Sequence, residues 1–461
     1  MKALVIAEKP SVARDIARVL KCTKNISGEI EGEKYVVTWA LGHLVTLADP
    51  EEYSKEYKEW KMEVLPMMPK PMKLIVIQKT AKQYRAVKEQ LFRKDIGEIV
   101  IATDAGREGE LVARWILEKA GCKKPIKRLW ISSVTDKAIR EGFAKLCDGR
   151  KYNDLYAAAV SRAEADWLVG INATRALTCK YNAQLSCGRV QTPTLAMIAK
   201  REEEIRAFRP QEYYGLQVQA GKIQWTWQDQ KSGGFRSFSK ERIETISSFV
   251  SNEKLSVKKV EKAAKKKYAP GLYDLTELQR DAKQKFGFSA KETLNIMQRL
   301  YENHKVLTYP RTDSRYIGTD IVDTIKDRLR AISVGPYKKL AGSLVMKPLR
   351  TNKSFVDDKK VSDHHAIIPT EQYVQLEHMT SEERKIYDLV VRRFLSVLYP
   401  PFENEQTTLH AVVLGEHAGK NSEEHYVAKG KIVKEAGWKT VYDYEEEEAE
   451  EGLKEQSLPT I

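Results

Sequence analysis

The chain has 461 residues, of which 42% are apolar, and its formal net charge is +14. This length exceeds what one hydrophobic core accommodates, so we expect roughly three or four domains. No segment approaches the ~20 consecutive apolar residues of a membrane-spanning helix, and the N-terminal apolar run is too short for a signal peptide, so composition argues against a helical membrane protein and we expect a cytoplasmic one.

The positive charge predicts a polyanionic partner. Composition alone does not separate DNA, RNA and an acidic membrane, although it favours nucleic acid. The acidic run EEEEAEE at 445–451 partly offsets the positive charge. We expect this run to be a solvated loop or a flexible linker.

Two kinds of motif, paired cysteines and a phosphate-binding P-loop, are missing from the sequence, and this limits the reactions that we expect. The cysteines form no C-x-x-C pair, which argues against a zinc ribbon and a disulfide framework, so we expect reduced, mostly packing thiols. No G-x-x-x-x-G-K-[ST] motif occurs, so the sequence gives no basis for an ATP-driven reaction. The five cysteines are Cys22, Cys122, Cys147, Cys179 and Cys187.

The first 150 residues alternate apolar strands with amphipathic helices. ALVIAE near the N-terminus and EIVIATD at 98–104 are typical of buried strands. Ser11 is a predicted N-cap of the helix after the first strand, and the helix after the second has an apolar face around Trp115. This alternation predicts an α/β domain with a largely parallel sheet.

The rest of the chain predicts a mixed, multi-domain α/β plus α+β protein. Residues 151–210 are rich in Ala and Arg with helical spacing, whereas 211–260 alternate and carry aromatic residues, which predicts antiparallel strands. A helical region follows at 274–306. A β-rich stretch resumes near 405–441.

Carboxylates follow both predicted strands of the first domain. Glu8 ends one and Asp104 the other, and in open α/β sheets ligands gather at the carboxyl ends of strands. Glu108 and Glu110 lie in the first turn of the next helix, where acids also simply complement the helix dipole. Oxygen ligands without nearby His or Cys favour Mg²⁺. Lys9 adds a cation suited to phosphoryl chemistry.

Tyr309 lies in the stretch LTYPRTDSR, and two interpretations compete for it. Pro310 favours an extended residue before it, so the stretch is typical of an ordinary turn. Alternatively, Tyr309 is a nucleophile and Arg311, two residues on, binds the same phosphate.

Five motifs together resemble the type IA DNA topoisomerases, and most of all those of the topoisomerase III kind. They occur in the family's order and at roughly its spacings. The resemblance covers nearly the whole chain. The motifs are IAEKPS at 6–11, TDAGREGE at 103–110, SCGRVQTPTL at 186–195, LTYPRTDSR at 307–315 and DHHAIIPT at 363–370.

The resemblance implies an ATP-independent enzyme that cleaves one DNA strand, passes another strand and reseals the break. Tyr309 would form the 5′-phosphotyrosine link with Arg311 on the same phosphate, Glu8 would be the general acid and Lys9 would contact the scissile phosphate. His364 matches a histidine near the family's active site, whereas His365 is expected to be structural.

The resemblance also implies a Mg²⁺ site. Glu8, Asp104 and Glu108 are its expected ligands, with Asp104 and Glu108 matching the outer members of an Asp-x-Asp-x-Glu motif. Gly106 replaces the middle acid, which leaves open whether one or two ions bind. Glu110 could compensate only if its side chain faces the metal.

Single-stranded DNA is the expected ligand of the third motif. By analogy Trp60, Trp167, Arg175 and Arg311 line the same groove, with a packing role in the core as the alternative for Trp167. The motif residues assigned to this binding are Ser186, Cys187, Gly188, Arg189, Val190 and Gln191.

The expected organisation is a Toprim domain followed by helical and β segments that enclose a DNA-sized hole. The protein would act as a monomer, near the nucleoid, on single-stranded and negatively supercoiled DNA, without ATP or membrane. The expected domains are a Toprim domain at 1–150, a helical strand-binding segment at 151–212, a first β-rich pass at 213–273, a helical domain with the nucleophile at 274–402 and a β-rich return with the acidic linker at 403–461.

The chain ends where the family's second strand-gripping segment would begin, so we expect a natural short form or a truncated product. Two other functions remain open. One is a Mg²⁺-dependent nuclease or primase-like protein, because these classes share the Toprim pattern. The other is a DNA-binding short form with impaired topoisomerase activity.

Overall fold

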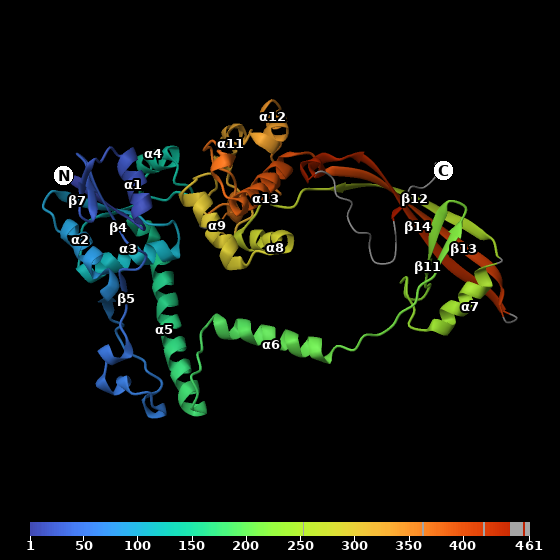
Figure 1. The fold of residues 1–461 in the computed structure, drawn as a ribbon, viewed down its shortest axis with the longest axis horizontal. Coiled ribbons are helices and arrows are strands. Elements are labelled where there is room, and N and C mark those ends of the chain that lie inside the picture. Colours follow the sequence, from blue (N-terminus) through green and yellow to red (C-terminus); the bar gives the residue numbers. More distant parts are fainter. Residues whose placement is uncertain (252, 362–363, 418–419, 443–454, 457–461) are drawn as a thin grey trace. The chain divides into compact units, whose positions relative to one another are not determined.

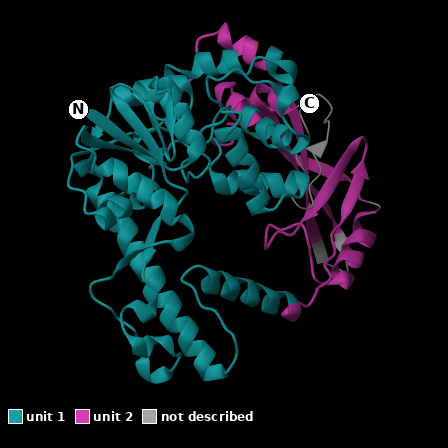
Figure 2. Ribbon diagram, turned by 60° about the vertical axis from the view of Figure 1, so that its left-hand side comes forward, with its two compact units in different colours: residues 1–205, 272–338, 353–391 teal, residues 206–271, 339–352, 392–461 magenta. Residues whose placement is uncertain are grey.

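The structure is a computed structural model that divides into two compact units (Figure 2). The acidic run at 445–451 lies outside the residues it describes. Among the described residues, no helix is long and apolar enough to cross a membrane. The described residues are 1–251, 253–361, 364–417, 420–442 and 455–456. Unit 1 comprises residues 1–205, 272–338 and 353–391, and unit 2 comprises residues 206–271, 339–352 and 392–461.

Unit 1 contains a seven-stranded sheet in the order β2-β3-β4-β1-β7-β8-β9. Figure 1 shows its strands β4 and β7 near the N-terminus. Strand β1 pairs in parallel with both β4 and β7, and β7 pairs in parallel with β8, as the sequence predicts. The outer pairs β2–β3, β3–β4 and β8–β9 are antiparallel. The strands are β1 (Lys2–Ala7), β2 (Lys24–Ile26), β3 (Glu29–Glu31), β4 (Tyr35–Trp39), β7 (Ile96–Ala102), β8 (Ile126–Arg128) and β9 (Cys147–Asp148).

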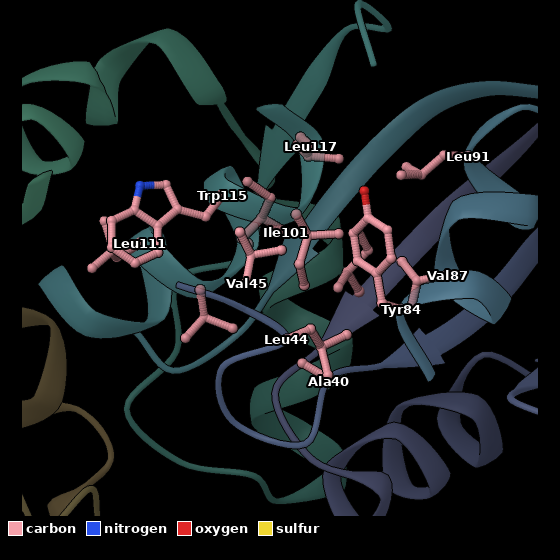
Figure 3. Packing of buried hydrophobic residues seen from close by; sticks show 14 of the residues in the cluster. Ala40, Leu44, Val45, Tyr84, Val87, Leu91, Ile101, Leu111, Trp115 and Leu117 are labelled. Carbon is pink, nitrogen blue, oxygen red and sulfur yellow. The ribbon is translucent and has the colours of Figure 1, made fainter. Parts of the chain in front are cut away.

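Both faces of this sheet are buried, because alternate residues of one strand enter different hydrophobic clusters. In β1, Leu4 and Ile6 join one cluster and Ala3, Val5 and Ala7 the other. The helices that cover the sheet are α1 (Pro10–Val19), α2 (Ala81–Leu91), α3 (Arg107–Ala120) and α4 (Asp136–Ala144). Figure 3 shows the first cluster, in which Tyr84, Val87 and Leu91 of α2 and Leu111, Trp115 and Leu117 of α3 pack around Ile101 of β7.

The predicted N-cap of α1 is wrong. The helix begins at Pro10, its N-cap is Lys9, and Ser11 lies inside the first turn. Proline is well suited to the first helical position, because its fixed φ fits the helix and its missing N–H would have no partner there. The proline therefore determines where the helix begins.

The remaining elements of unit 1 are mostly helical. The two-stranded ribbon of β5 (Val45–Leu47) and β6 (Leu74–Val76) lies against α3. Helix α9 begins with a capping box of Ser289 and Glu292. The helices are α5 (Asn153–Tyr181), α6 (Gln191–Ala207), α8 (Leu275–Phe286), α9 (Ala290–Glu302), α10 (Thr319–Val322) and α11 (Ile325–Ala331). Helix α6 reaches into unit 2 with its last two residues, and helices α12 (Lys338–Val345) and α13 (Ser381–Leu398) also cross the division between the units.

Unit 2 is built on one antiparallel sheet in the order β10-β11-β14-β13-β12, with β15 beside β14. The two β-rich stretches of the sequence, 211–260 and 405–441, therefore pair with each other, through β11–β14 and β12–β13. The strands are β10 (Gln217–Ala220), β11 (Ile223–Gln228), β12 (Leu255–Lys267), β13 (Phe402–His417), β14 (Lys420–Glu435) and β15 (Glu455–Gln456).

One helix in unit 2 corrects the strand prediction for 211–260. Helix α7 spans Lys240–Val250 and begins at an N-cap serine, Ser239, whose hydroxyl accepts from the Arg242 amide. Ile243, Ile246 and Val250 bury its apolar face at helical spacing. The serine cap and the 3.6-residue spacing of apolar residues make this segment a helix, although the residues around it alternate as in strands.

Candidate active site

Two carboxylates meet at the carboxyl edge of the parallel sheet. Because β1 and β7 are parallel neighbours, the residues after them lie side by side, and the Asp104 amide donates a 2.9 Å hydrogen bond to Glu8 Oε2. Burial and the nearby charge of Glu8 raise the pKa of Asp104 from 3.8 to about 7. The predicted convergence of these two acids is therefore present in the structure.

This pair has the chemistry of a Mg²⁺ site. A cation would offset both the burial and the Glu8 charge that raise the pKa of Asp104, and Mg²⁺ needs only one or two protein carboxylates. Glu108 faces elsewhere: its Oε1 lies 2.6 Å from His43 Nε2, which lowers its pKa. No three His, Cys, Asp or Glu side chains within the described ranges cluster as metal ligands. Glu108 must therefore leave His43 to join Glu8 and Asp104.

The glycine in the middle of the acidic motif is not required by backbone geometry. Gly106 has φ 175°, which is extended backbone open to any residue. A Cβ added there would meet nothing within 4 Å. The position therefore has room for the aspartate that the family motif carries. Sterics do not explain why this chain lacks a carboxylate there.

Glu110 does not serve the metal site. Its side chain is fully buried and pairs with Arg114 Nε at 2.9 Å and with Arg128 Nε at 2.8 Å. Arg128 also donates to the carbonyls of Thr103 and Asp104, at 2.8 and 2.7 Å. Glu110 therefore cannot replace the acid missing at position 106. Through Arg128, Glu110 instead stabilises the turn that carries Asp104.

Tyr309 lies buried at the same edge of the sheet. Its amide donates to the Ser132 carbonyl at 2.9 Å, and its side chain is only 9% exposed. The ring stacks on His364, with centroids 4.2 Å apart, and packs edge-to-face on Tyr301 at 5.5 Å. This environment is not that of the exposed loop expected for an ordinary turn.

The phenol of Tyr309 is held in its neutral form. Burial raises its pKa, the charges of Asp104 and Glu8 raise it further, and the Arg311 charge partly opposes them. Arg311 itself is exposed. A phosphate that binds beside Arg311 therefore faces a neutral tyrosine. The phenol must lose its proton before its oxygen can attack the phosphorus.

His364 connects Tyr309 to the turn after β7. Its Nε2 faces the Ala105 carbonyl, which can only accept, so Nε2 carries the hydrogen and Nδ1 accepts from the Ser132 hydroxyl at 3.1 Å. Burial lowers its pKa to about 4, so the ring is neutral. The predicted structural residue, His365, is also buried, and its Nδ1 lies 2.7 Å from the Ala366 carbonyl.

Lys9 has a protein partner in this structure. Its Nζ lies 2.6 Å from Glu302 Oε1, at the end of α9. The charge of Lys9 lowers the pKa of Asp104, which shows that the ammonium is near the two carboxylates. Lys9 is thus at the predicted edge of the sheet, but it is engaged by a carboxylate.

The motif at 186–191 follows α5 and lies at the surface, where a ligand has access to it. Arg189 Nε is 2.7 Å from Asp166, so its guanidinium is already oriented. Cys187 is tied to Thr174 through its amide at 2.9 Å. Ser186, Arg189, Val190 and Gln191 are exposed, and Cys187 and Gly188 are partly exposed.

Two of the predicted groove residues have packing roles. Trp167 is 9% exposed, belongs to the hydrophobic core and donates from Nε1 to the Ala48 carbonyl at 2.9 Å, so the alternative of a core residue holds. Arg175 is 4% exposed and donates to the Tyr57 carbonyl at 2.5 Å. Trp60 is 49% exposed and stacks under the Arg175 guanidinium. Of the three, Trp60 alone is open to a ligand.

Four residues of the site carry no motif. Ser132 contacts both Tyr309 and His364, and Trp130 stacks on His364 with centroids 6.3 Å apart. Glu302 and His43 hold Lys9 and Glu108. Trp130 and Ser132 follow β8, and His43 follows β4, both parallel strands of the sheet, but no motif marks them; Glu302 comes from the end of α9.

Asp104→Asn should stabilise the protein increasingly as pH rises. Because the pKa of Asp104 is raised from 3.8 to about 7, the native state binds one proton more than the unfolded state between these values, and stability falls across this window. Asn carries no such penalty. In urea unfolding with EDTA, the variant should gain about 2–4 kcal/mol over the parent between pH 4 and pH 8.

The exposed Asp323 provides the control, since its replacement by Asn should give a difference that does not change with pH. A pH-independent difference for Asp104→Asn as well would show that neither burial nor the Glu8 charge raises the pKa of Asp104.

Comparisons with known proteins agree on one family. Residues 150–461 match the model described as DNA topoisomerase, and residues 3–134 match the Toprim domain. Proteins named DNA topoisomerase 3 from Bacillus cereus (strain ATCC 10987 / NRS 248) and Bacillus subtilis (strain 168) are 61% and 58% identical over the whole chain, which spans 62% of their length.

A solved structure has the same fold. Full-length topoisomerase I from Thermotoga maritima aligns with a TM-score of 0.69 and 24% identity, covering 98% of this chain and 70% of that one. This confirms the expected fold class, a Toprim α/β domain followed by helical and β segments. With the motif residues at the edge of the Toprim sheet, these matches show that the chain belongs to the type IA DNA topoisomerases, of the topoisomerase III kind.

Proposed function

We propose that this chain cleaves and rejoins one strand of DNA through a covalent link between Tyr309 and the 5′-phosphate, without ATP. The observation that carries the proposal is the position of the Tyr309 phenol, stacked on His364 beside Asp104 and Glu8 at one edge of the sheet. A nucleophile, acids and cations are the groups that such a transfer requires.

The residues divide the chemistry among them. Tyr309 Oη attacks the phosphorus as its proton passes to Asp104, the nearby carboxylate whose pKa of about 7 suits proton transfer at neutral pH. The bond from phosphorus to the 3′-oxygen breaks, and the proton that Asp104 received passes through the adjacent Glu8 carboxylate to that oxygen. Rejoining reverses these steps, so the energy of the broken bond stays in the phosphotyrosine.

Cations hold the phosphate in place. Arg311, exposed two residues after the nucleophile, can bind two phosphate oxygens in the bidentate manner of a guanidinium. Lys9 is positioned to approach the same phosphate from the sheet edge. His364 holds the Tyr309 ring in place by stacking on it and is not itself a base, because its Nε2–H is bound to the Ala105 carbonyl.

Mg²⁺ is the proposed cofactor, held by Glu8 and Asp104, with Glu108 joining when it leaves His43. The Toprim domain is a Mg²⁺-binding fold. When bound, the ion would neutralise charge beside the phosphate and orient the ends for rejoining. The two adjacent carboxylates of Glu8 and Asp104 are the feature of the site that favours it.

The proposed ligands are single-stranded DNA and negatively supercoiled duplex. Residues 186–191 and Trp60, exposed on unit 1, are the proposed contacts to the single strand. The chain would relax negative supercoils or separate linked DNA as a cytoplasmic, nucleoid-associated monomer. The proposed division of the chain remains 1–150, 151–212, 213–273, 274–402 and 403–461.

Protein-linked DNA tests the proposal. The chain is incubated with single-stranded oligonucleotides labelled at either end and stopped with denaturant. We expect protein-bound label only from the 3′-labelled oligonucleotide, because the 5′-phosphate of the downstream fragment stays on Tyr309. With EDTA, binding should persist while rejoining of the cleaved strand is lost. Label bound from the 5′ end, or free ends without adduct, would instead favour a nuclease.

A further inference from the structure

The end of helix α9 is attached to the Toprim sheet edge by two ion pairs. Lys9 Nζ lies 2.6 Å from Glu302 Oε1, and Lys305 Nζ lies 2.6 Å from Asp15 Oδ1. All four side chains are partly or largely buried, the most exposed being Lys9 at 37%. These pairs join segments far apart in sequence, and their helix-side residues follow directly after Tyr301, which packs on Tyr309.

Glu302 is a third carboxylate of the active site. The negative charges of Glu302 and Glu8 both contribute to the raised pKa of Asp104, so all three carboxylates lie close together. The Glu302 side chain is 16% exposed, and Gln298 donates to it from the preceding turn of α9. The carboxylate is therefore held in place by its own helix, aimed at Lys9.

We propose that Glu302 is a positioning residue that holds Lys9 until a DNA phosphate displaces it. The inference rests on the proposed function, in which Lys9 contacts the scissile phosphate. A carboxylate and a phosphodiester each offer one negative charge and oxygen acceptors, so they compete for the same ammonium. In the DNA-free protein Glu302 thus stands where the phosphate charge will be, and Lys9 is orientated before the substrate arrives.

The exchange also couples substrate binding to the attachment of α9. When Lys9 turns to the phosphate, the Lys9–Glu302 pair is lost and the Lys305–Asp15 pair remains. The released Glu302 then keeps only the Gln298 hydrogen bond and lies without a cation beside a phosphate, which is unfavourable. Substrate binding therefore loosens the attachment of the helix end next to Tyr309.

Glu302→Gln tests the exchange, because glutamine keeps the shape and removes the competing charge. We measure oligonucleotide binding by fluorescence anisotropy in a Tyr309→Phe background, so that cleavage does not interfere. The dissociation constant should fall by about three- to tenfold, the scale of one partly buried ion pair. Amide exchange at the end of α9 should rise on oligonucleotide binding in the parent and be already high in free Glu302→Gln.

Asp15→Asn is the matched control, since it removes the same charge from the neighbouring pair, and from Arg18 at 3.2 Å, without freeing Lys9. An equal gain in affinity for Asp15→Asn would mean general electrostatics and overturn the proposal, as would a Glu302→Gln variant that binds like the parent. The gain should also vanish when Lys9 is replaced by Gln; a persistent gain counts against the exchange.

The Lys9→Gln variant distinguishes a failure of the Glu302 exchange from a failure of the proposed function. If Lys9→Gln weakens binding but Glu302→Gln does not strengthen it, the exchange is wrong and the proposed function stands. If Lys9→Gln binds as tightly as the parent, the assignment of Lys9 to the phosphate is itself wrong.

Discussion

Tyr309→Phe should abolish the covalent adduct while leaving single-strand binding within about twofold of the parent. The substitution removes only the hydroxyl, so the stacking on His364 and the edge-to-face contact with Tyr301 are retained. Without a nucleophilic oxygen no phosphotyrosine can form, and loss of a nucleophile lowers rates by at least about a thousandfold. Denaturing gels with 3′-labelled oligonucleotide measure the adduct, and anisotropy measures binding.

Tyr316→Phe is the matched control. Tyr316 lies in the same stretch of chain, and its hydroxyl accepts from Lys360 at 3.2 Å, away from Asp104. Its replacement should leave the adduct unchanged. If instead Tyr309→Phe still cleaves DNA and leaves free ends, the chain is a Toprim nuclease. If neither variant nor the parent forms an adduct, the chain binds DNA without the proposed chemistry.

The sequence predicts those parts of the site that follow from strand ends. Glu8 and Asp104 converge because β1 and β7 are parallel neighbours, and parallel pairing can be read from two apolar runs. The Toprim fold is predictable for the same reason. The motif around Tyr309 identifies the nucleophile only through the family resemblance, since residues 307–315 by themselves fit a turn equally well.

The sequence does not predict which polar residues are buried as pairs. Trp167 and Arg175 are of the residue types that line a DNA groove, an aromatic ring and a cation, yet their side chains are buried inside unit 1. Glu302 has no motif at all, and its contact with Lys9 joins positions 293 residues apart. Such contacts depend on how the segments dock, and no local period or spacing encodes them.

His364 shows what a motif match leaves out. The resemblance places a histidine near the active site, but its tautomer follows only from the carbonyl and hydroxyl around it. A neutral ring with Nε2–H bound to Ala105 is suited to holding Tyr309 and the Asp104 turn together, and not to taking a proton from the phenol.

The structure gives Glu110 a role that neither of its interpretations from sequence included. A metal ligand would face the sheet edge, and an acid that only complements the helix dipole would be exposed. Instead Glu110 is buried between Arg114 and the fully buried Arg128. Arg128 in turn donates to the carbonyls of Thr103 and Asp104. The ion pair therefore supports the turn that presents Asp104.

Glu110→Gln should consequently destabilise the protein by about 3–5 kcal/mol, because it leaves the buried Arg128 charge without its counterion and brings an amide N–H₂ against an arginine donor. Urea unfolding at pH 7 measures the loss. Glu118→Gln on the same helix is the control: Glu118 is exposed, and glutamine can still accept its hydrogen bond from the Tyr156 hydroxyl, so the change should cost less than about 1 kcal/mol.

The functional effect of Glu110→Gln should appear at Asp104. When Arg128 loses its anchor, the turn at 103–105 loses the donor that fixes its carbonyls, and both the Glu8–Asp104 pair and the Ala105 contact to His364 loosen. At a temperature where the variant is still folded, rejoining should need more Mg²⁺ than in the parent, while single-strand binding through residues 186–191 is unchanged. An unaltered Mg²⁺ titration in a destabilised variant would mean that Arg128 stabilises the domain without positioning Asp104.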